Sequence, residues 1–158
     1  MTLINELTTF IKDNLPEPIY RGQKFSSFMD NLEIDRMFKF VGLSPINQLV
    51  CAKLKYDAVI TFEDFPYRSY DPCIVLALVI VWLENKNRDD DDFNNVNPSI
   101  DVSENDEQTA YLMISVPLSE EIRLIEDENG IIPYKSKRYK LGSENIWVYP
   151  ENVNINAN

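Results

Sequence analysis

Apolar residues near the start of the chain recur every three or four positions, which is the spacing of one face of an α-helix. Thr2 is placed to cap this helix, and Pro16 is placed to end it. The residues of the apolar stripe are Leu3, Ile4, Leu7, Phe10 and Ile11. The pattern therefore predicts a first helix with one buried face.

A second helix is predicted over residues 74–83, which form an almost unbroken apolar run. Asp71 precedes the run as a side-chain cap, and Pro72 falls in its first turn. A fully buried strand is the alternative, because several residues are β-branched, but a strand is not expected to begin with Asp-Pro or to exceed about 10 residues. A membrane span would need about 20 apolar residues, whereas Glu84 already closes this run. We therefore expect a buried helix.

Two segments before this run alternate between apolar and polar residues, which is typical of strands with one buried face. In residues 32–40 the even positions are apolar except for Arg36, and a helix is the alternative for this segment. Residues 54–62 alternate more regularly. Because residues 44–47 carry a turn signal, Ser-Pro-Ile-Asn, the two strands are predicted to form a hairpin.

A third long strand is predicted over residues 110–124 by the same alternation. Glu120 interrupts its apolar face. Pro117 lies on the opposite face and indicates an edge or a bulge, because proline cannot donate a hydrogen bond to a neighbouring strand. A shorter alternating segment, residues 100–102, precedes this strand.

Further short strands are predicted toward the end of the chain. Asn129 and Gly130 form a strong hairpin signal, because both tolerate the positive φ angles of a tight turn. A return strand is therefore expected at residues 131–134. Residues 146–149 alternate once more, and the asparagine-rich residues 151–158 are expected to be flexible.

These elements add up to an α+β domain: a mainly antiparallel sheet of four to six strands with two α-helices packed on one face. The length predicts that residues 1–158 form a single domain. Residues 86–98 are polar and are expected to form an exposed, mobile loop. The strands are long, and strands that extend beyond their covering helices project as hairpins that need a partner.

Composition excludes many functions. The formal net charge of −11 and the pI near 4.4 disfavour binding to nucleic acid or to anionic lipid, so protein partners are expected. The sequence contains no histidine, which excludes the common catalytic triads and histidine metal sites. Adjacent carboxylates such as Glu63 and Asp64 point to opposite faces of a strand and do not form an acid-base pair. We predict no enzyme activity and no cofactor.

The two cysteines, Cys51 and Cys73, lie in apolar surroundings and are predicted to be small core residues rather than ligands or nucleophiles. The N-terminus lacks a basic segment followed by a long apolar one, so no secretory signal is expected. These features favour folding in a reducing cytoplasm.

Two oppositely charged segments are candidate contacts between subunits. The acidic residues Asp89, Asp90, Asp91 and Asp92 lack the spacing and the glycine of a calcium-binding loop, so a solvated loop is favoured over a metal site. The basic residues are Lys135, Lys137, Arg138 and Lys140. In a head-to-tail ring the basic segment of one copy could face the acidic segment of the next, and the alternative is ordinary surface charge.

Aromatic residues are a second group of candidate contacts. Most are expected to be core residues, and base stacking is disfavoured by the negative charge. An exposed subset of Phe25, Phe28 and Trp147 would suit a subunit contact, where aromatic residues are enriched.

The segment from Tyr56 to Asn85 carries the most specific pattern. A strand ends in Asp-Phe, an acidic loop follows, and an apolar helix closes on Trp-Leu-x-x-Asn. A second signature is the strand over residues 111–118. The positions in the first pattern are Asp64, Phe65, Trp82, Leu83 and Asn85. Together these resemble the tail completion protein R (GpR) family of contractile-tailed temperate bacteriophages over roughly residues 25–124.

This resemblance implies a structural virion protein of the phage tail, assembled in the bacterial cytoplasm, with a tail-terminator-like fold. It would complete or cap the head-proximal end of the tail tube as a hexameric ring. Its partners would be the tail tube protein and the head-tail neck or completion proteins. The alternatives are a neck or baseplate adaptor of a phage tail and a non-viral regulatory adaptor. The matching motifs are fold signatures and identify no working residue.

Overall fold

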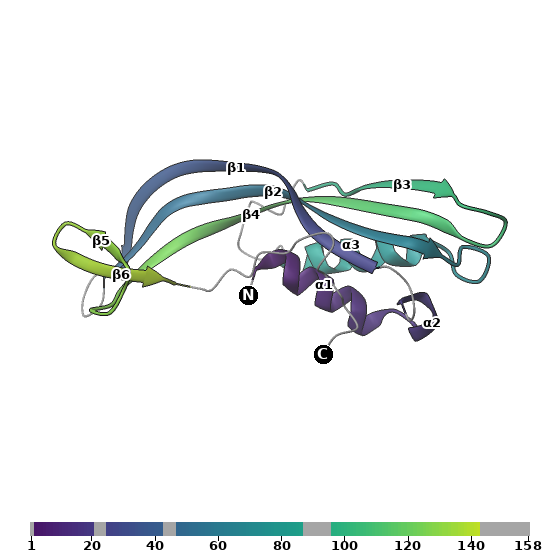
Figure 1. Cartoon of the computed structure of the whole chain (residues 1–158), viewed down its shortest axis with the longest axis horizontal. Helices are drawn as coiled ribbons and strands as arrows, with labels where there is room; N and C mark the ends of the chain where they lie inside the picture. Colours follow the sequence, from purple (N-terminus) through teal and green to yellow (C-terminus); the bar gives the residue numbers. More distant parts are fainter. Residues whose placement is uncertain (1, 21–24, 43–46, 87–95, 143–158) are drawn as a thin grey trace.

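The computed structural model describes residues 2–20, 25–42, 47–86 and 96–142. The elements are α1 (Leu3–Asn14), α2 (Glu17–Tyr20), β1 (Phe25–Gly42), β2 (Gln48–Phe65), α3 (Cys73–Lys86), β3 (Ser99–Glu104), β4 (Ala110–Glu126), β5 (Ile132–Tyr134) and β6 (Lys137–Leu141). The strands form one antiparallel sheet in the order β1-β2-β4-β6-β5, and β3 also pairs with β4. The predicted α+β fold with two main helices is confirmed (Figure 1).

Local side-chain caps begin both main helices. The Thr2 hydroxyl accepts a hydrogen bond from the Asn5 N–H at 3.3 Å, and α1 ends where Leu15 N–H donates to the Ile11 carbonyl. The Asp71 carboxylate accepts the N–H of Cys73 at 2.9 Å at the start of α3. The predicted caps are confirmed, and the apolar run after Pro72 is a helix rather than a strand.

The main core lies between the two helices and one face of the sheet, called here the inner face. Alternate residues of β2 and β4 point into this core, as their period-2 pattern predicts. One of them, Phe62, stacks on Phe25 with ring centroids 4.2 Å apart. The core residues from these two strands are Leu54, Tyr56, Ala58, Ile60, Phe62, Phe65, Leu112, Ile114, Val116 and Leu118.

The sheet extends well beyond the helices and forms a curved arm. We define the arm as residues 32–42, 47–55 and 119–142. Figure 1 shows α1 and α3 beneath one part of the sheet, while β5 and β6 lie at the far end of the long strands β1, β2 and β4. The arm has a small cluster of its own at this tip, made of Leu49, Leu124 and Tyr139. The predicted projection of long strands beyond their covering helices is therefore confirmed.

A backbone irregularity helps to shape the tip. Phe38 has a positive φ of 58°, which is unusual for an aromatic residue. Its ring lies 4.6 Å, centroid to centroid, from that of Tyr134 on β5, which packs against the tip cluster. One edge of the sheet, β1, thus curls toward the other edge, β5.

Several sequence predictions need correction in detail. The first strand is confirmed as a strand paired with β2 in a hairpin, but it begins at Phe25 instead of residue 32. The strand after the turn at residues 127–130 pairs with β6 and not with β4, and β6 itself was not predicted. Residues 146–149 lie outside the described residues.

Pro117 marks an edge and not a bulge. β4 pairs with β2 through this position without a shift in register. On its other side, β4 pairs with β3 up to Ser115 and with β6 from Leu124 onward. Pro117 lies between these two paired segments of β4. No strand of the described part of the chain pairs with β4 on that side at this position, so the missing N–H of proline is tolerated there.

Candidate interaction surfaces

The inner face of β1 in the arm is apolar and exposed. Ile34 pairs with Leu54 and Phe40 pairs with Leu49, and both partners are buried on the inner face, so Ile34 and Phe40 lie on that face too. The side chain of Ile34 is nevertheless 66% exposed. We call Leu32, Ile34, Arg36 and Phe40 the arm row. Among the described residues, no helix covers it (Figure 1).

The outer face of the same part of β1 is polar. Glu33 and Asp35 pair there with Lys55 and Lys53, and Lys55 forms an ion pair with Asp35 at 2.7 Å. An amphipathic strand whose apolar face is exposed is typical of a protein interaction surface.

α3 carries a second exposed apolar surface. Val75, Val79, Trp82 and Leu83 are buried, whereas Ile80 is 51% exposed and Val81 is 49% exposed. The prediction of a buried helix is therefore only half right. We call Ala77, Ile80, Val81 and Glu84 the α3 stripe, since their spacing places them on one helix face. A helix that is apolar on all sides is normally covered on all sides.

Cys73 precedes this stripe and is exposed, which contradicts its prediction as a core residue. The Asp71 carboxylate raises the pKa of its thiol. Cys51 is half-buried and packs against the tip cluster, as predicted.

The basic segment forms the hairpin of β5 and β6 at the tip of the arm. Its turn is made by Lys135 and Ser136, which both have positive φ angles. Lys137 forms an ion pair with Glu126 at 2.8 Å, and Lys140 forms one with Asp127 at 3.4 Å. Two of the four cations are thus paired within the chain and attach the hairpin to the end of β4.

These pairs move the pKa values of their members in the expected directions. Hydrogen bonding to Lys137 lowers the pKa of the Glu126 carboxyl, and Glu126 raises the pKa of Lys137. The pKa of Asp127 is lowered first by the N–H of Asn129 and further by Lys140. All four groups are on the surface, so these contacts are screened by solvent.

Acid is therefore expected to loosen the tip hairpin before it unfolds the helix-covered part. A carboxyl whose pKa is depressed on folding contributes stability above its ordinary pKa, about 4, and that contribution is lost as the pH falls. NMR titration from pH 7 to pH 3 should show the amide signals of residues 126–141 shifting or broadening first. The Glu126→Gln, Asp127→Asn double variant should not show this early change, and an identical titration in that variant would contradict the assignment.

The aromatic and acidic candidate contacts differ in burial and in whether the structure describes them. Phe25 is buried in the main core and is not available for a subunit contact, because it packs against Phe62. Phe28 is half-buried on β1. Trp147 and the acidic segment 89–92 lie outside the described residues, so the pairing of basic and acidic segments stays a prediction.

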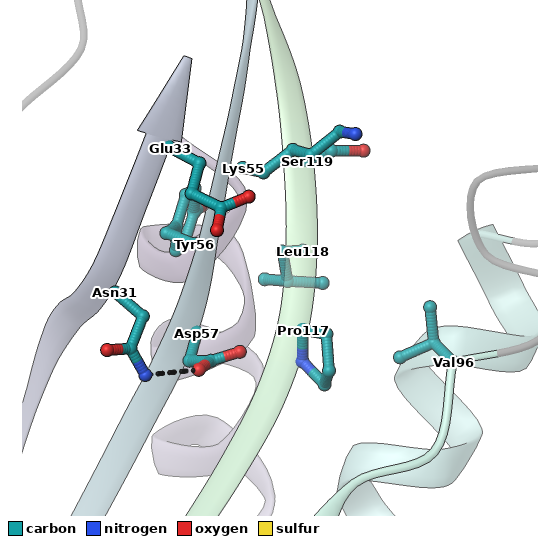
Figure 2. A pocket seen from close by; sticks show the side chains of 9 residues that line it. All are labelled: Asn31, Glu33, Lys55, Tyr56, Asp57, Val96, Pro117, Leu118 and Ser119. Carbon is teal, nitrogen blue, oxygen red and sulfur yellow. Dashed lines mark hydrogen bonds between the residues drawn. The ribbon is translucent and has the colours of Figure 1, made fainter. Parts of the chain in front are cut away.

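One pocket lies along β1, β2 and β4 where the arm joins the helix-covered part (Figure 2). In it, the Asn31 side chain donates to the Asp57 carboxylate at 2.8 Å, and Asn31 has a positive φ. Glu33, Lys55 and Ser119 complete its polar side. Lys55 forms an ion pair with Asp35, so the polar groups of the pocket make one ion pair and one hydrogen bond rather than a nucleophile beside a base.

The described residues also lack two other kinds of site. No group of three or more histidine, cysteine or acidic side chains is arranged to hold a metal ion there. None of the helices in this part of the chain has the length and apolar character needed to cross a bilayer.

The two exposed apolar surfaces were not identified as sites from the sequence. The alternation in residues 32–40 predicted a face to be buried in the core, and the run 74–83 predicted a buried helix. One sequence signal for the α3 stripe was available. Residues 74–83 are apolar on every side, whereas a helix that buries only one side needs apolar residues on that side alone.

Comparison with known proteins gives one family. The family described as P2 phage tail completion protein R (GpR) matches residues 1–143. An uncharacterized 19.2 kDa protein in the rep-hol intergenic region of Haemophilus phage HP1 (strain HP1c1) is 22% identical over 149 residues, which cover 94% of this chain and 87% of that protein. No solved structure matches.

Proposed function

Because the chain belongs to the P2 phage tail completion protein R (GpR) family, we propose that it caps the head-proximal end of the tail tube and prepares that end for joining to the head. The observation that carries this proposal is the family match over residues 1–143. A member of this family is a structural phage tail completion protein and not an enzyme.

The proposed mechanism is surface complementarity without a chemical step. Identical copies form a closed ring, hexameric like the tube beneath it, so that every copy makes the same contacts. One face of the ring matches the last ring of the tail tube, and the other face receives the neck proteins. The exposed arm row and α3 stripe support this proposal, because exposed apolar patches mark protein interaction sites.

Disrupting the gene in a phage that carries it is expected to give overlong tails that are not joined to heads. Electron microscopy of the particles, with tail length and head attachment scored, makes the measurement, and a plasmid copy of the intact gene is the control. Normal tails joined to heads would reject the capping role. Normal tails that lack heads or baseplates would instead favour a neck or a baseplate adaptor, respectively.

A further inference from the structure

Within the part of the chain that the structure describes, one stretch of the sheet has no helix over its inner face, and one face of α3 has no sheet against it. The arm row lies on the inner face of the sheet, the same face that α1 and α3 cover elsewhere. The α3 stripe lies on the side of α3 that is turned away from the core. We propose that the arm row of one copy packs onto the α3 stripe of the next copy, head to tail.

The two surfaces match in chemistry. Each is a short apolar patch with one charged residue, Arg36 in the arm row and Glu84 in the α3 stripe. Neither charge has an ion-pair partner within the described part of the chain. In a helix-on-sheet contact the apolar side chains would pack and the two charges would pair.

The spacing of the two surfaces also matches. Ile34 and Arg36 are two residues apart on a strand, which is about 6.6 Å. Ile80 and Glu84 are four residues apart on a helix, which is about 6 Å. When Ile34 packs against Ile80, Arg36 can therefore pair with Glu84.

The distribution of charge favours a second copy of this chain as the occupant. The arm contains nine cationic and seven anionic residues, a formal charge of +2. The rest of the chain contains six cationic and nineteen anionic residues, a formal charge of −13. The arm of one copy is thus attracted to the acidic remainder of another in spite of the overall negative charge.

A contact between two different surfaces of identical chains is heterologous, and it closes into a ring when the rotation between copies is suitable. Each copy then uses its arm row once and its α3 stripe once, which leaves neither surface exposed. This inference rests on the ring assembly of the proposed function and names the surfaces that would form it.

A charge swap tests the contact. Arg36→Glu and Glu84→Arg each place like charges together and should lower the yield of infectious particles, in a phage lacking its own copy, by about tenfold or more. The double variant restores opposite charges in exchanged positions and should recover most of the yield. Both side chains are on the surface, so circular dichroism and thermal melting of each variant should match the unchanged protein.

The outcomes separate the contact from the function. Single variants with full activity, or a double variant no better than the singles, would overturn the contact even if the unchanged gene supports normal tails. A double variant that is no better than the singles would mean that the arm row faces a different tail protein. If loss of the gene leaves the tails normal, the proposed function fails instead.

Cysteine crosslinking gives a second measurement that does not depend on the charges. Ile34→Cys and Ile80→Cys are combined in a protein with Cys51→Ser and Cys73→Ser. Mild oxidation of assembled tails should give covalent oligomers, whereas either cysteine alone should give none above the background. The absence of crosslinked species in intact tails would count against the proposed packing.

Discussion

Replacing Gly130 by alanine is expected to displace the tip hairpin from the arm. A Cβ atom at this position would lie 2.2 Å from the carbonyl oxygen and 2.3 Å from the carbonyl carbon of Tyr139. Both are backbone atoms, so no change of rotamer relieves the clash, and β6 has to move. Because Tyr139 is one of the three residues of the tip cluster, we expect the tip to lose about 2–3 kcal/mol of local stability.

Hydrogen exchange is the measurement, because it resolves local opening from global unfolding. Amides of residues 124–126 and 137–141 should exchange faster, whereas those of α1 and α3 should change little. Gly42→Ala is the matched control, because the nearest atoms to a Cβ there would be those of the Gln48 side chain, at 3.6 Å or more. Equal exchange rates in the two variants would show that the turn at Gly130 does not support the tip.

Much of the fold could be predicted because it depends on local patterns. The caps at Thr2 and Asp71 and the alternation in residues 110–124 act through neighbours in the chain, and the structure confirms each of them. β6 could not be found in this way. Four of its residues are exposed, only Tyr139 is buried, and its turn uses Lys135 and Ser136 in place of the usual glycine or asparagine.

The candidate surfaces could not be predicted because periodicity does not report which segment covers a face. Residues 32–40 alternate like a strand with a buried face, and residues 110–118 do the same. Helices cover the second segment and do not reach the first, a difference that depends on how far the strands run past α1 and α3 (Figure 1). The exposed apolar face of β1 thus becomes visible only in three dimensions.

Glu120 shows how an apparent error in the apolar pattern can be a structural requirement. It interrupts the inner face of β4, where the helix-covered part gives way to the arm. Its carboxylate accepts two hydrogen bonds, one from the Leu3 N–H at 3.0 Å and one from the Tyr56 hydroxyl. An anionic group at the start of α1 also complements the helix dipole. Burial, followed by the Glu120 contact, raises the pKa of Tyr56, so its hydroxyl stays a donor.

Glu120→Ala is expected to lower the free energy of unfolding by about 3 kcal/mol, because it leaves two partly buried donors without an acceptor. Chemical denaturation followed by circular dichroism measures this loss. The neighbouring Glu121→Ala is the control and should cost less than about 0.5 kcal/mol, since Glu121 lies on the opposite face in a weak surface contact with Arg123 at 3.4 Å.

A second substitution distinguishes lost hydrogen bonds from lost packing at this junction. Adding Tyr56→Phe to Glu120→Ala removes one of the unpaired donors, so the double variant should be less destabilised than the sum of the two single variants. Strict additivity would mean that the Tyr56 hydroxyl does not depend on Glu120. If the Glu120→Ala and Glu121→Ala variants are equally stable, the hydrogen bonds of Glu120 do not contribute to stability. The start of α1 would then be held to β4 by apolar contacts alone.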